Sequence, residues 1–335
     1  MNLLHSISSR IALCVVFVAV VSSSWAMEHD AKIYVAGHRG LVGSAIVRKL
    51  EREGFSDIIV RTHQELDLRN PVAVNNFFAQ ERPDYVFLAA AKVGGIKANS
   101  DYPAQFIYDN LMIECNIINA AYENGVKKLL FLGSSCIYPR ECPQPIKEEY
   151  LLSGPLEKTN DAYAIAKIAG IKLCQAYNQQ YDTRFICCMP TNLYGPHDNF
   201  DLKTSHVLPA LIRKIYEAQQ QGDETVPLWG TGKPYREFLH VDDLADACLF
   251  LMQYYEGSDI INVGMGNDIT IAELAQFIAR VIGYEGSFTF DPSMPDGTPR
   301  KLLDVSRLHA LGWQPQFSLE EGINNTVTWY ESQQH

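Results

Sequence analysis

The sequence has no surplus of positive charge. Its 335 residues include 28 Lys and Arg against 39 Asp and Glu, which gives a formal net charge of −11 at pH 7. Nucleic-acid binding needs a basic surface, so nucleic acid is not an expected partner. Hydrophobic residues make up 47% and charged residues 20%, values that exclude long disorder, collagen and coiled coil. Any phosphate that this protein binds is therefore held by local features of its fold.

The N-terminal hydrophobic run is too short to span a bilayer. Ile11–Val21 has 11 residues, whereas a spanning helix needs about 20. With Arg10 before this run and Ala26 after it, residues 1–26 have the layout of a secretory signal. The favoured alternative is that translation begins at Met27 and that residues 1–26 are an upstream extension.

The cysteines lack the spacing of a metal site or a redox pair. Eight are present, without CxxC and without a Cys/His ligand pattern. Without Cys14, which lies in the leader, seven remain, an odd number. A chain of this length needs no disulfide staples either. We therefore expect reduced thiols and no metal.

Short apolar runs alternate with helical patterns over the first 190 residues. This alternation predicts an α/β fold with a parallel, doubly wound (Rossmann) sheet. The expected strands are 32–36, 58–60, 85–89, 129–132 and 185–189, and the expected helices are 44–53, 71–80, 104–123 and 160–181.

Loops become longer and richer in Pro and Gly after about residue 190. We expect three parts: the leader or extension at 1–26, a nucleotide-binding domain at 27–190, and a smaller substrate-binding lobe at 191–335. Some of the second half is expected to cross back to the sheet, and the lobe to close over the carboxyl ends of the strands. Its expected helices lie at about 205–220, 242–254, 270–282 and 318–331.

Three glycines, Gly37, Gly40 and Gly43, stand where the first strand becomes the first helix. Glycine allows a tight turn and a close approach to a pyrophosphate, and the helix N-terminus supplies unpaired N–H groups. The motif is weak alone, but its place in a βαβ unit predicts a dinucleotide site.

The residues that follow the second strand favour NADP(H) over NAD. An NAD site has an acidic residue about 20 positions after the glycines, but here Arg61 and His63 occur. These side chains, with Arg39 in the glycine turn, complement a 2′-phosphate. Asp67 is a candidate adenine contact. The alternative is that Arg61 is an ordinary solvated residue at a strand end.

Ser134, Tyr163 and Lys167 form a candidate catalytic set. Ser134 follows the fourth strand, where active-site residues collect in such sheets. Tyr163 and Lys167 are four apart and share a helix face. A nearby ammonium is expected to lower the pKa of the phenol, which then donates a proton to a ketone oxygen while hydride reaches the carbon.

The chain resembles the extended short-chain dehydrogenase/reductase family over about residues 31–330, and within it the nucleotide-sugar reductases. The resemblance implies a cofactor site of Gly37, His38, Arg39, Gly40, Leu41, Val42, Gly43, Arg61, His63, Asp67, Leu132, Gly133, Ser134, Ser135, Lys167, Pro190, Thr191, Asn192, Leu193 and His206. The resemblance to this family rests on residues 37–40, 89–96, 133–139, 163–167, 190–200, 205–207, 236–243 and 295–305.

The resemblance also implies the reaction. The implied substrate is GDP-4-keto-6-deoxymannose, whose C3 and C5 are inverted before NADPH reduces the C4 ketone. Cys136 is assigned as base and His206 as acid, while Ser134 and Tyr163 bind the ketone oxygen in both steps. Cys136 then needs a pKa below about 8.5, which Lys167 favours. From the residues alone, Cys136 is a small buried hydrophobe and His206 an N-terminal helix residue.

Five residues are expected at the GDP-sugar. Lys214 and Arg236 match the contacts of the family, Lys301 is a further cation, Trp229 packs on the base or sugar, and Asp296 accepts from the sugar or guanine. Trp229 also suits a loop anchor. Members of the family can carry arginine where His63 and Lys214 stand. Neutral histidine weakens selectivity for NADPH, and lysine loses bidentate phosphate geometry.

Other interpretations remain open. A nucleotide-sugar 4-epimerase or 4,6-dehydratase uses the same scaffold, and a non-catalytic family member is a third possibility. Ser135 and Cys136 occupy the places where a dehydratase usually has an acidic pair, and the intact Ser134, Tyr163 and Lys167 disfavour a non-catalytic role. The family implies a cytoplasmic homodimer that pairs through the helices at 104–123 and 159–181. An exported form is the alternative location.

Overall fold

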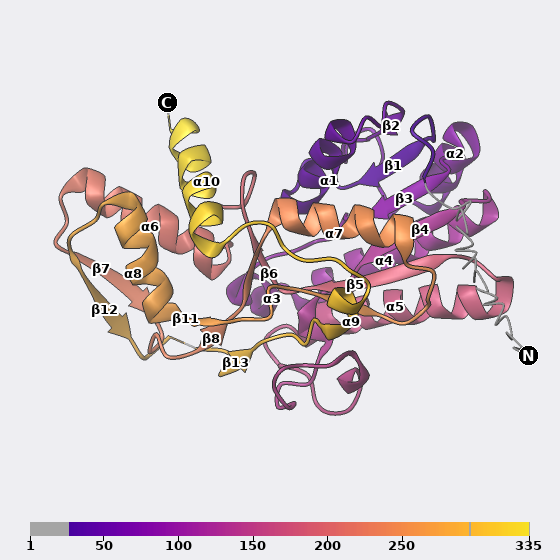
Figure 1. Ribbon diagram of the computed structural model, residues 1–335. Helices are drawn as coiled ribbons and strands as arrows, with labels where there is room; N and C mark the ends of the chain where they lie inside the picture. Colours follow the sequence, from indigo (N-terminus) through magenta and orange to yellow (C-terminus); the bar gives the residue numbers. More distant parts are fainter. Residues whose placement is uncertain (1–26, 295, 335) are drawn as a thin grey trace, which may run out of the picture.

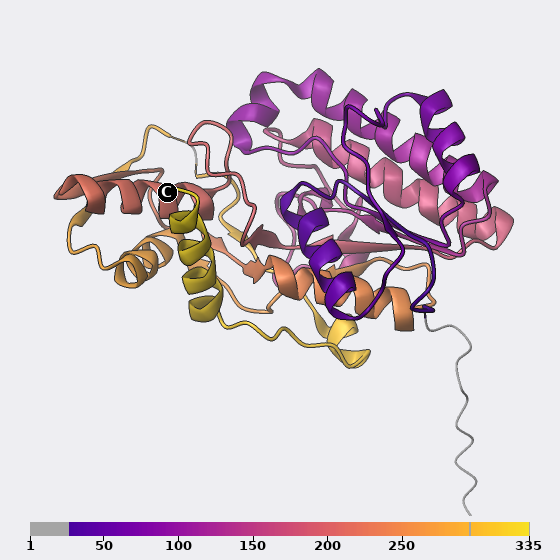
Figure 2. The same cartoon turned by 90° about the horizontal axis from the view of Figure 1, so that it is seen from above.

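The computed structural model describes residues 27–294 and 296–334 and shows two lobes (Figures 1 and 2). The signal-like segment 1–26 lies outside the described residues. The larger lobe is built on a six-stranded sheet, and the smaller lobe is built from helices α6 (Val207–Gln221), α8 (Ile271–Ile282) and α10 (Leu319–Ser332) with short strands. Among the described residues, no helix is both long and apolar enough to cross a membrane.

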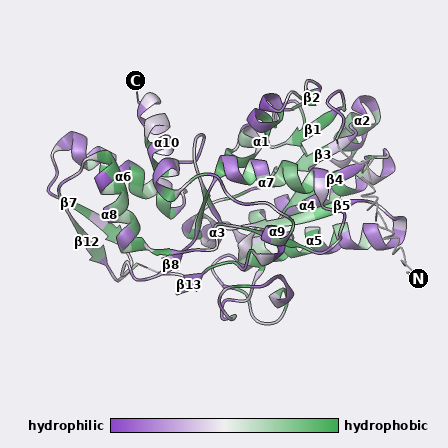
Figure 3. Ribbon diagram, viewed as in Figure 1, coloured by the Kyte–Doolittle hydropathy of each residue, from purple (hydrophilic) through white to green (hydrophobic). Residues whose placement is uncertain are grey.

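All five strand pairings of the main sheet are parallel, in the order β10-β5-β4-β3-β1-β2. Most of its strand residues are buried, as apolar strands covered on both faces must be (Figure 3). This sheet confirms the predicted α/β class. Its strands are β1 (Ile33–Ala36), β2 (Ile58–Ile59), β3 (Tyr85–Leu88), β4 (Lys128–Leu132), β5 (Phe185–Pro190) and β10 (Ile261–Val263).

Helices cover both faces of the sheet because successive strand residues point to opposite sides. Ile33 and Val35 of β1 join the core formed with α1 (Leu41–Arg52) and α7 (Val241–Tyr254). Tyr34 and Ala36 join the core on the other face. The helices of that face are α2 (Pro71–Glu81), α4 (Pro103–Glu123) and α5 (Asp161–Tyr181).

The strand order reverses between β1 and β3, since β2 lies on one side of β1 and β3 on the other. Ligands of such sheets bind outside the carboxyl ends of the strands at this switch point. β1 ends at Ala36 and β4 at Leu132, so the glycine turn and Ser134 lie at the same edge of the sheet.

The smaller lobe has its own core of apolar side chains from three helices: α6 (Val207–Gln221), α8 (Ile271–Ile282) and α10 (Leu319–Ser332). Three small sheets border it: β7 (Thr225–Trp229) with β12 (Ser287–Asp291), β6 (Asn192–Tyr194) with β9 (Phe238–His240), and β8 (Tyr235–Arg236) with β11 (Ile269–Thr270) and β13 (Arg300–Lys301). The remaining short helices are α3 (Ile96–Asp101), η1 (Ser135–Ile137), η2 (Glu148–Tyr150) and α9 (Ser306–Ala310).

The second half of the chain is divided between the lobes. α7 packs against α1, and β10 extends the main sheet beside β5. β6 and β9 pair where the chain passes between the lobes, so that residues from both halves meet at the carboxyl edge of the main sheet. This arrangement lets small-lobe side chains face the residues that follow β4.

Candidate active site

The glycine turn has no room for side chains. Gly37 has a positive φ of 88°, and a Cβ there would lie 2.8 Å from the amide nitrogen of Ala90, beyond β3. A Cβ on Gly43 would lie 2.1 Å from the carbonyl oxygen of Gly37. No side chain caps α1 at Gly40, so the N–H groups of its first turn can bind a phosphate. The turn therefore fits a dinucleotide pyrophosphate.

The residues expected at the 2′-phosphate differ in whether their charge is already paired within the protein. The Arg61 guanidinium lies 2.5 Å from Glu81 Oε1 and over the ring of Phe77, so its charge is already paired. Arg39 and His63 are exposed. The closeness of Arg39 adds to burial in lowering the pKa of His38. We conclude that Arg39, rather than Arg61, presents its charge to solvent here.

Asp67, the candidate adenine contact, forms a bidentate pair with Arg69. The Nε and Nη2 atoms of Arg69 lie 3.0 and 2.9 Å from the two carboxylate oxygens. This pairing lowers the pKa of Asp67 to about 2, so the carboxylate is ionised at neutral pH. His63 Nδ1 is 3.8 Å from the same carboxylate. Sequence reasoning missed Arg69, which holds Asp67 in place.

The segment after β5 is fixed through its backbone and its polar side chains. Thr191 N–H donates to the Val263 carbonyl, and Asn192 Nδ2 donates to the Glu237 carbonyl at 2.8 Å. The Glu237 carboxylate accepts from the backbone N–H groups of Gly266 and Leu303. Glu237 is fully buried and was not predicted from the sequence. It ties together three chain segments beside the expected nicotinamide contacts Pro190, Thr191, Asn192 and Leu193.

Ser134 and Cys136 lie just past β4. Ser134 caps η1, and its Oγ accepts from the Cys136 N–H at 3.3 Å. Gly133 allows β4 and β5 to approach closely here, since a Cβ would meet the sulfur of Met189 at 2.4 Å. Leu132 and Ser135 are buried beside them. The main-chain turn thus presents a hydroxyl and a thiol two residues apart.

The pKa of Cys136 departs from the expectation. The thiol side chain is 7% exposed, and burial raises its pKa from the ordinary value. Lys301 is the charge that most opposes this rise, ahead of Lys167. The effect of burial on the pKa of Cys136 exceeds that of both lysines. The prediction that Lys167 lowers this pKa below its usual value is therefore wrong for the structure described here.

Tyr163 and Lys167 share a face of α5, but Lys167 forms an ion pair with Glu114. Lys167 Nζ lies 3.1 Å from Glu114 Oε1, 4.6 Å from the ring centre of Phe131 and 5.8 Å from that of Tyr163. Burial raises the pKa of Tyr163 well above its usual value, and Cys136 and Glu114 add to the rise. The expected lowering of this pKa by Lys167 is therefore wrong here, because burial dominates and Lys167 forms its ion pair with Glu114.

His206 immediately precedes α6. His206 is an exposed residue, and partial desolvation of its ring, followed by the charge of Lys301, lowers its pKa. The segment before it is held by a hydrogen bond from Gly95 N–H to the Thr204 carbonyl at 3.0 Å. A Cβ on Gly95 would lie 2.7 Å from the Ser205 carbonyl oxygen. The loop before α3 therefore supports the backbone that carries His206.

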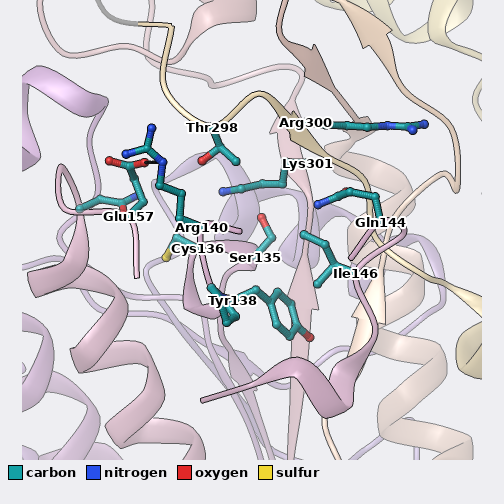
Figure 4. A pocket seen from close by; sticks show the side chains of 12 residues that line it. Ser135, Cys136, Tyr138, Arg140, Gln144, Ile146, Glu157, Thr298, Arg300 and Lys301 are labelled. Carbon is teal, nitrogen blue, oxygen red and sulfur yellow. Dashed lines mark ion pairs between the residues drawn. The ribbon is translucent and has the colours of Figure 1, made fainter. Parts of the chain in front are cut away.

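A pocket opens between the η1 turn and β13 (Figure 4). Cys136 and Ser135 lie on one wall, and Lys301 and Thr298 on the other. Its far side has an ion pair, with Arg140 Nε 3.3 Å from Glu157 Oε2. The charge of Lys301 opposes the rise in the pKa of Cys136 and adds to the lowering of the pKa of His206.

Lys301, which lines this pocket, has a second cation beside it on the neighbouring strand. Lys301 and Arg236 are paired residues on neighbouring strands β13 and β8. Burial lowers the pKa of each, and Arg236 further lowers that of Lys301. Adjacent cations of this kind suit a diphosphate.

Trp229 and Lys214 lie farther out on the small lobe. Trp229 is 49% exposed, and Lys214 Nζ is 5.6 Å from its ring centre and donates to the Pro227 carbonyl. The Asp296 carboxylate accepts from the N–H and hydroxyl of Thr231 at 2.7 and 2.8 Å. Asp296 thus joins two loops, while its carbonyl oxygen accepts from Arg236.

No group of three or more His, Cys, Asp or Glu side chains within residues 27–294 and 296–334 is arranged to hold a metal ion. The seven cysteines of the same residues are all free thiols. The pocket therefore brings together hydroxyls, the Cys136 thiol and cations. Such a set serves proton transfer and binding of a phosphorylated ligand.

Known proteins share this chain's sequence and fold. GDP-L-fucose synthase 1 of Arabidopsis thaliana is 60% identical over 303 residues, covering 90% of this chain and 94% of that protein. GDP-L-fucose synthase of Escherichia coli (strain K12) is 58% identical over 308 residues, covering 89% and 96%. The crystal structure of a GDP-L-fucose synthetase from Naegleria fowleri bound to NADP has a TM-score of 0.86 and 32% identity, covering 92% and 96%.

A family model also matches residues 33–264, which include the glycine turn, Ser134, Tyr163, Lys167 and His206. It is described as the NAD dependent epimerase/dehydratase family. Its extent and the identity to the two synthases confirm the resemblance to the extended short-chain reductases. The chain belongs to the NAD dependent epimerase/dehydratase family.

Proposed function

We propose that this protein converts GDP-4-keto-6-deoxy-D-mannose into GDP-L-fucose with NADPH, by 3,5-epimerisation followed by reduction of the C4 ketone. Relatives with that name are 54–60% identical over most of the chain. The observation that carries the proposal is the pocket in which Cys136 faces Lys301, with Lys301 also influencing His206. A plain reductase has no need of a thiol and an imidazole at one ketone.

NADP(H) is held at the switch point of the sheet. Gly37 and Gly43 leave room for the pyrophosphate, and the α1 N-terminus binds it. Arg39 is placed to bind the 2′-phosphate, with His38 and His63 nearby, and residues 190–193 line the nicotinamide. When bound, NADPH supplies the hydride for the reduction.

The epimerisation relies on acidic hydrogens at C3 and C5, which are both α to the ketone. Cys136 is the proposed base and His206 the proposed acid. Lys301 favours the thiolate of Cys136, against the effect of burial. Ser134 and Tyr163 hydrogen-bond the ketone oxygen and stabilise the enolate.

The reduction relies on proton donation by Tyr163. The raised pKa of this phenol keeps its proton in place until the ketone oxygen gains negative charge. Ser134 holds the same oxygen from the end of β4. Lys167 lies beneath Tyr163 on α5 and supports its orientation.

The GDP part of the substrate is bound by the small lobe. Arg236 and Lys301 take the diphosphate, and Lys214 extends this positive surface. Trp229 offers an exposed ring on which the base or sugar packs. Asp296 supports the loop that presents these groups and is the proposed acceptor for a guanine or sugar group.

The protein is proposed to act as a homodimer in the cytoplasm. α4 and α5 leave Tyr108 62% exposed and Ile165 46% exposed, and Tyr122 stacks on Tyr181 at 4.2 Å. These groups give the two helices an aromatic, apolar outer face that suits a second copy. The free thiols of the described chain suit a reducing compartment.

The test is to follow NADPH absorbance after adding GDP-4-keto-6-deoxymannose to the purified protein and to identify the sugar product. Oxidation of NADPH with formation of GDP-L-fucose is the expected result. No NADPH oxidation with this ketone, together with inversion of the C4 hydroxyl in a nucleotide sugar that has no ketone, indicates a 4-epimerase and contradicts the proposal. Binding of NADPH with no change in any 4-keto nucleotide sugar indicates a non-catalytic member.

A further inference from the structure

Lys167 shares a buried site with a carboxylate that no sequence motif marks. Glu114 comes from the middle of α4, and its Oε1 lies 3.1 Å from Lys167 Nζ on α5. The side chains of Glu114 and Lys167 are 1% and 2% exposed. Two opposite charges therefore face each other in the interior, next to the helix position that carries Tyr163.

The ammonium of Lys167 is the polar partner of the Glu114 carboxylate. Neither carboxylate oxygen has a hydrogen-bond partner of suitable geometry among the described residues, so the ion pair is the polar contact that the structure shows for it. Gly170 provides the space, since a Cβ there would lie 2.9 Å from Glu114 Oε2 and 2.5 Å from the ring of Phe131. The interface of α4 and α5 is thus shaped around this carboxylate.

We propose that Glu114 is a positioning residue for the reduction, which holds the ammonium of Lys167 charged and fixed beneath Tyr163. This inference rests on the proposed function, because it gives Lys167 the role of supporting the tyrosine that protonates the ketone oxygen. Glu114 itself touches neither the substrate site nor the pocket of Cys136. Its effect passes through the lysine.

Electrostatics explains why the pair matters. An unpaired ammonium in the interior is costly and loses its proton more readily than one in water. Phe131 contributes a ring face 4.6 Å from Nζ but no full charge. The pKa of Glu114 is itself raised by burial, and Lys167 opposes that rise. Removing the carboxylate therefore shifts the balance toward a neutral amine.

Other titratable groups face the pair from the elements packed around it. Tyr163 lies on α5, and the charge of Lys167 lowers the pKa of Cys136 on η1 against the effect of burial. The charge of Glu114 contributes to raising the pKa of Cys115 on α4 and of Cys187 on β5. Burial raises the pKa of Cys136 and Tyr163, a hydrogen bond with Cys174 followed by burial raises that of Cys187, and the pKa of the exposed Cys115 is raised as well. Glu114 and Lys167 are therefore the charged members of this cluster.

A second buried lysine provides a matched control. Lys128 Nζ is 3.0 Å from Glu256 Oε1, and its side chain is 1% exposed. This pair lies at the opposite end of β4 from Ser134, at the end of α7. Glu256→Gln makes the same chemical change beside a buried lysine and away from the active site, at a carboxylate that is itself 45% exposed and also pairs with Arg184.

The experiment compares the wild-type protein with Glu114→Gln, Glu114→Asp and Glu256→Gln. The first measurement is the pH dependence of kcat for NADPH oxidation between pH 6 and 9. Glu114→Gln is expected to move the basic limb to lower pH, with about a tenfold loss of kcat above that limb for each pH unit of displacement. Glu114→Asp restores part of the wild-type profile, and Glu256→Gln keeps it while lowering the Tm.

The second measurement does not depend on turnover. Protein labelled with 13C at the lysine ε-carbon is titrated by NMR, and the Lys167 signal is assigned by its loss in Lys167→Met. In Glu114→Gln this signal is expected to titrate at lower pH than in the wild-type protein. Unchanged titration and an unchanged pH profile, with only a lower Tm, overturn the inference. Failure of the wild-type protein to turn over the sugar refutes the proposed function instead, and the NMR titration then decides the role of Glu114.

Discussion

Alanine at Gly95 is expected to damage epimerisation and spare reduction. Gly95 has φ −66° and ψ 179°, which any residue adopts, so Gly95→Ala introduces no backbone strain. The added Cβ would lie 2.7 Å from the Ser205 carbonyl oxygen, whereas ordinary contact begins at 3.4 Å. One of the two segments must therefore move by about 0.7 Å.

The segment that moves is the one that carries His206. Asn99 is buried and donates from Nδ2 to the carbonyls of Gly94 and Gly95, which anchors the turn before α3. Thr204, by contrast, is exposed, and its side chain is hydrogen-bonded to Asp201 and Asn199 of its own loop, so that the loop can shift with it. A misplacement of about 1 Å costs on the order of a hundredfold in rate, so a shift of this size predicts a loss of roughly tenfold to a hundredfold.

The assay separates the two steps. Exchange of the C3 and C5 hydrogens with solvent reports epimerisation, and NADPH oxidation with a substrate that is already epimerised reports reduction. Gly95→Ala is expected to slow the first and leave the second within about twofold of wild type. Ser100→Ala, on the exposed side of α3, serves as the control. Equal loss of both activities would refute the assignment of this turn to His206.

Three further predictions concern stability and the thiol. Lys128→Met removes the donor that three carbonyls at the end of α7 share, so denaturant titration should show a loss of about 2–5 kcal/mol in unfolding free energy; no loss contradicts the reasoning. Burial raises the pKa of Asp198 from 3.8 to about 7, so the folded state binds the extra proton and stability falls as pH rises through that window. Asp198→Asn should flatten this fall, and an unchanged pH dependence is the contrary result. Cys136→Ser should abolish exchange at C3 and C5 but keep reduction of the epimerised substrate, and persisting exchange refutes the base assignment.

Much of the larger lobe could be predicted from the sequence. Its strands are short apolar runs between amphipathic helices, and the glycine turn fixes where the first strand ends. The return of β10 to this sheet was expected only in general terms, because pairing between residues 261 and 188 leaves no local signal. The short strands of the small lobe were not predicted for the same reason. β7 even contains Pro227, which lowers the strand signal although the strand forms.

The candidate site was only partly predictable. Motif residues at the ends of β1, β4 and β5 follow from the rule that parallel strands place their carboxyl ends at one edge. The charged neighbours of these residues could not be predicted in the same way, because they come from distant parts of the chain. Glu81 forms an ion pair with Arg61, and the charge of Lys301 acts on the pKa of Cys136. Glu114 did leave a signal. It lies in line with Asn110 and Ile117 on the buried face of α4, where a carboxylate needs a partner.

The central claim is that one pocket carries out both proton exchange beside the ketone and its reduction. The most direct measurement is the position of deuterium in the product formed from GDP-4-keto-6-deoxymannose and NADPH in deuterated water. The account predicts deuterium at C3 and C5 and hydrogen from NADPH at C4. A reduced product that contains no deuterium at C3 or C5 would contradict it and leave an ordinary ketone reductase.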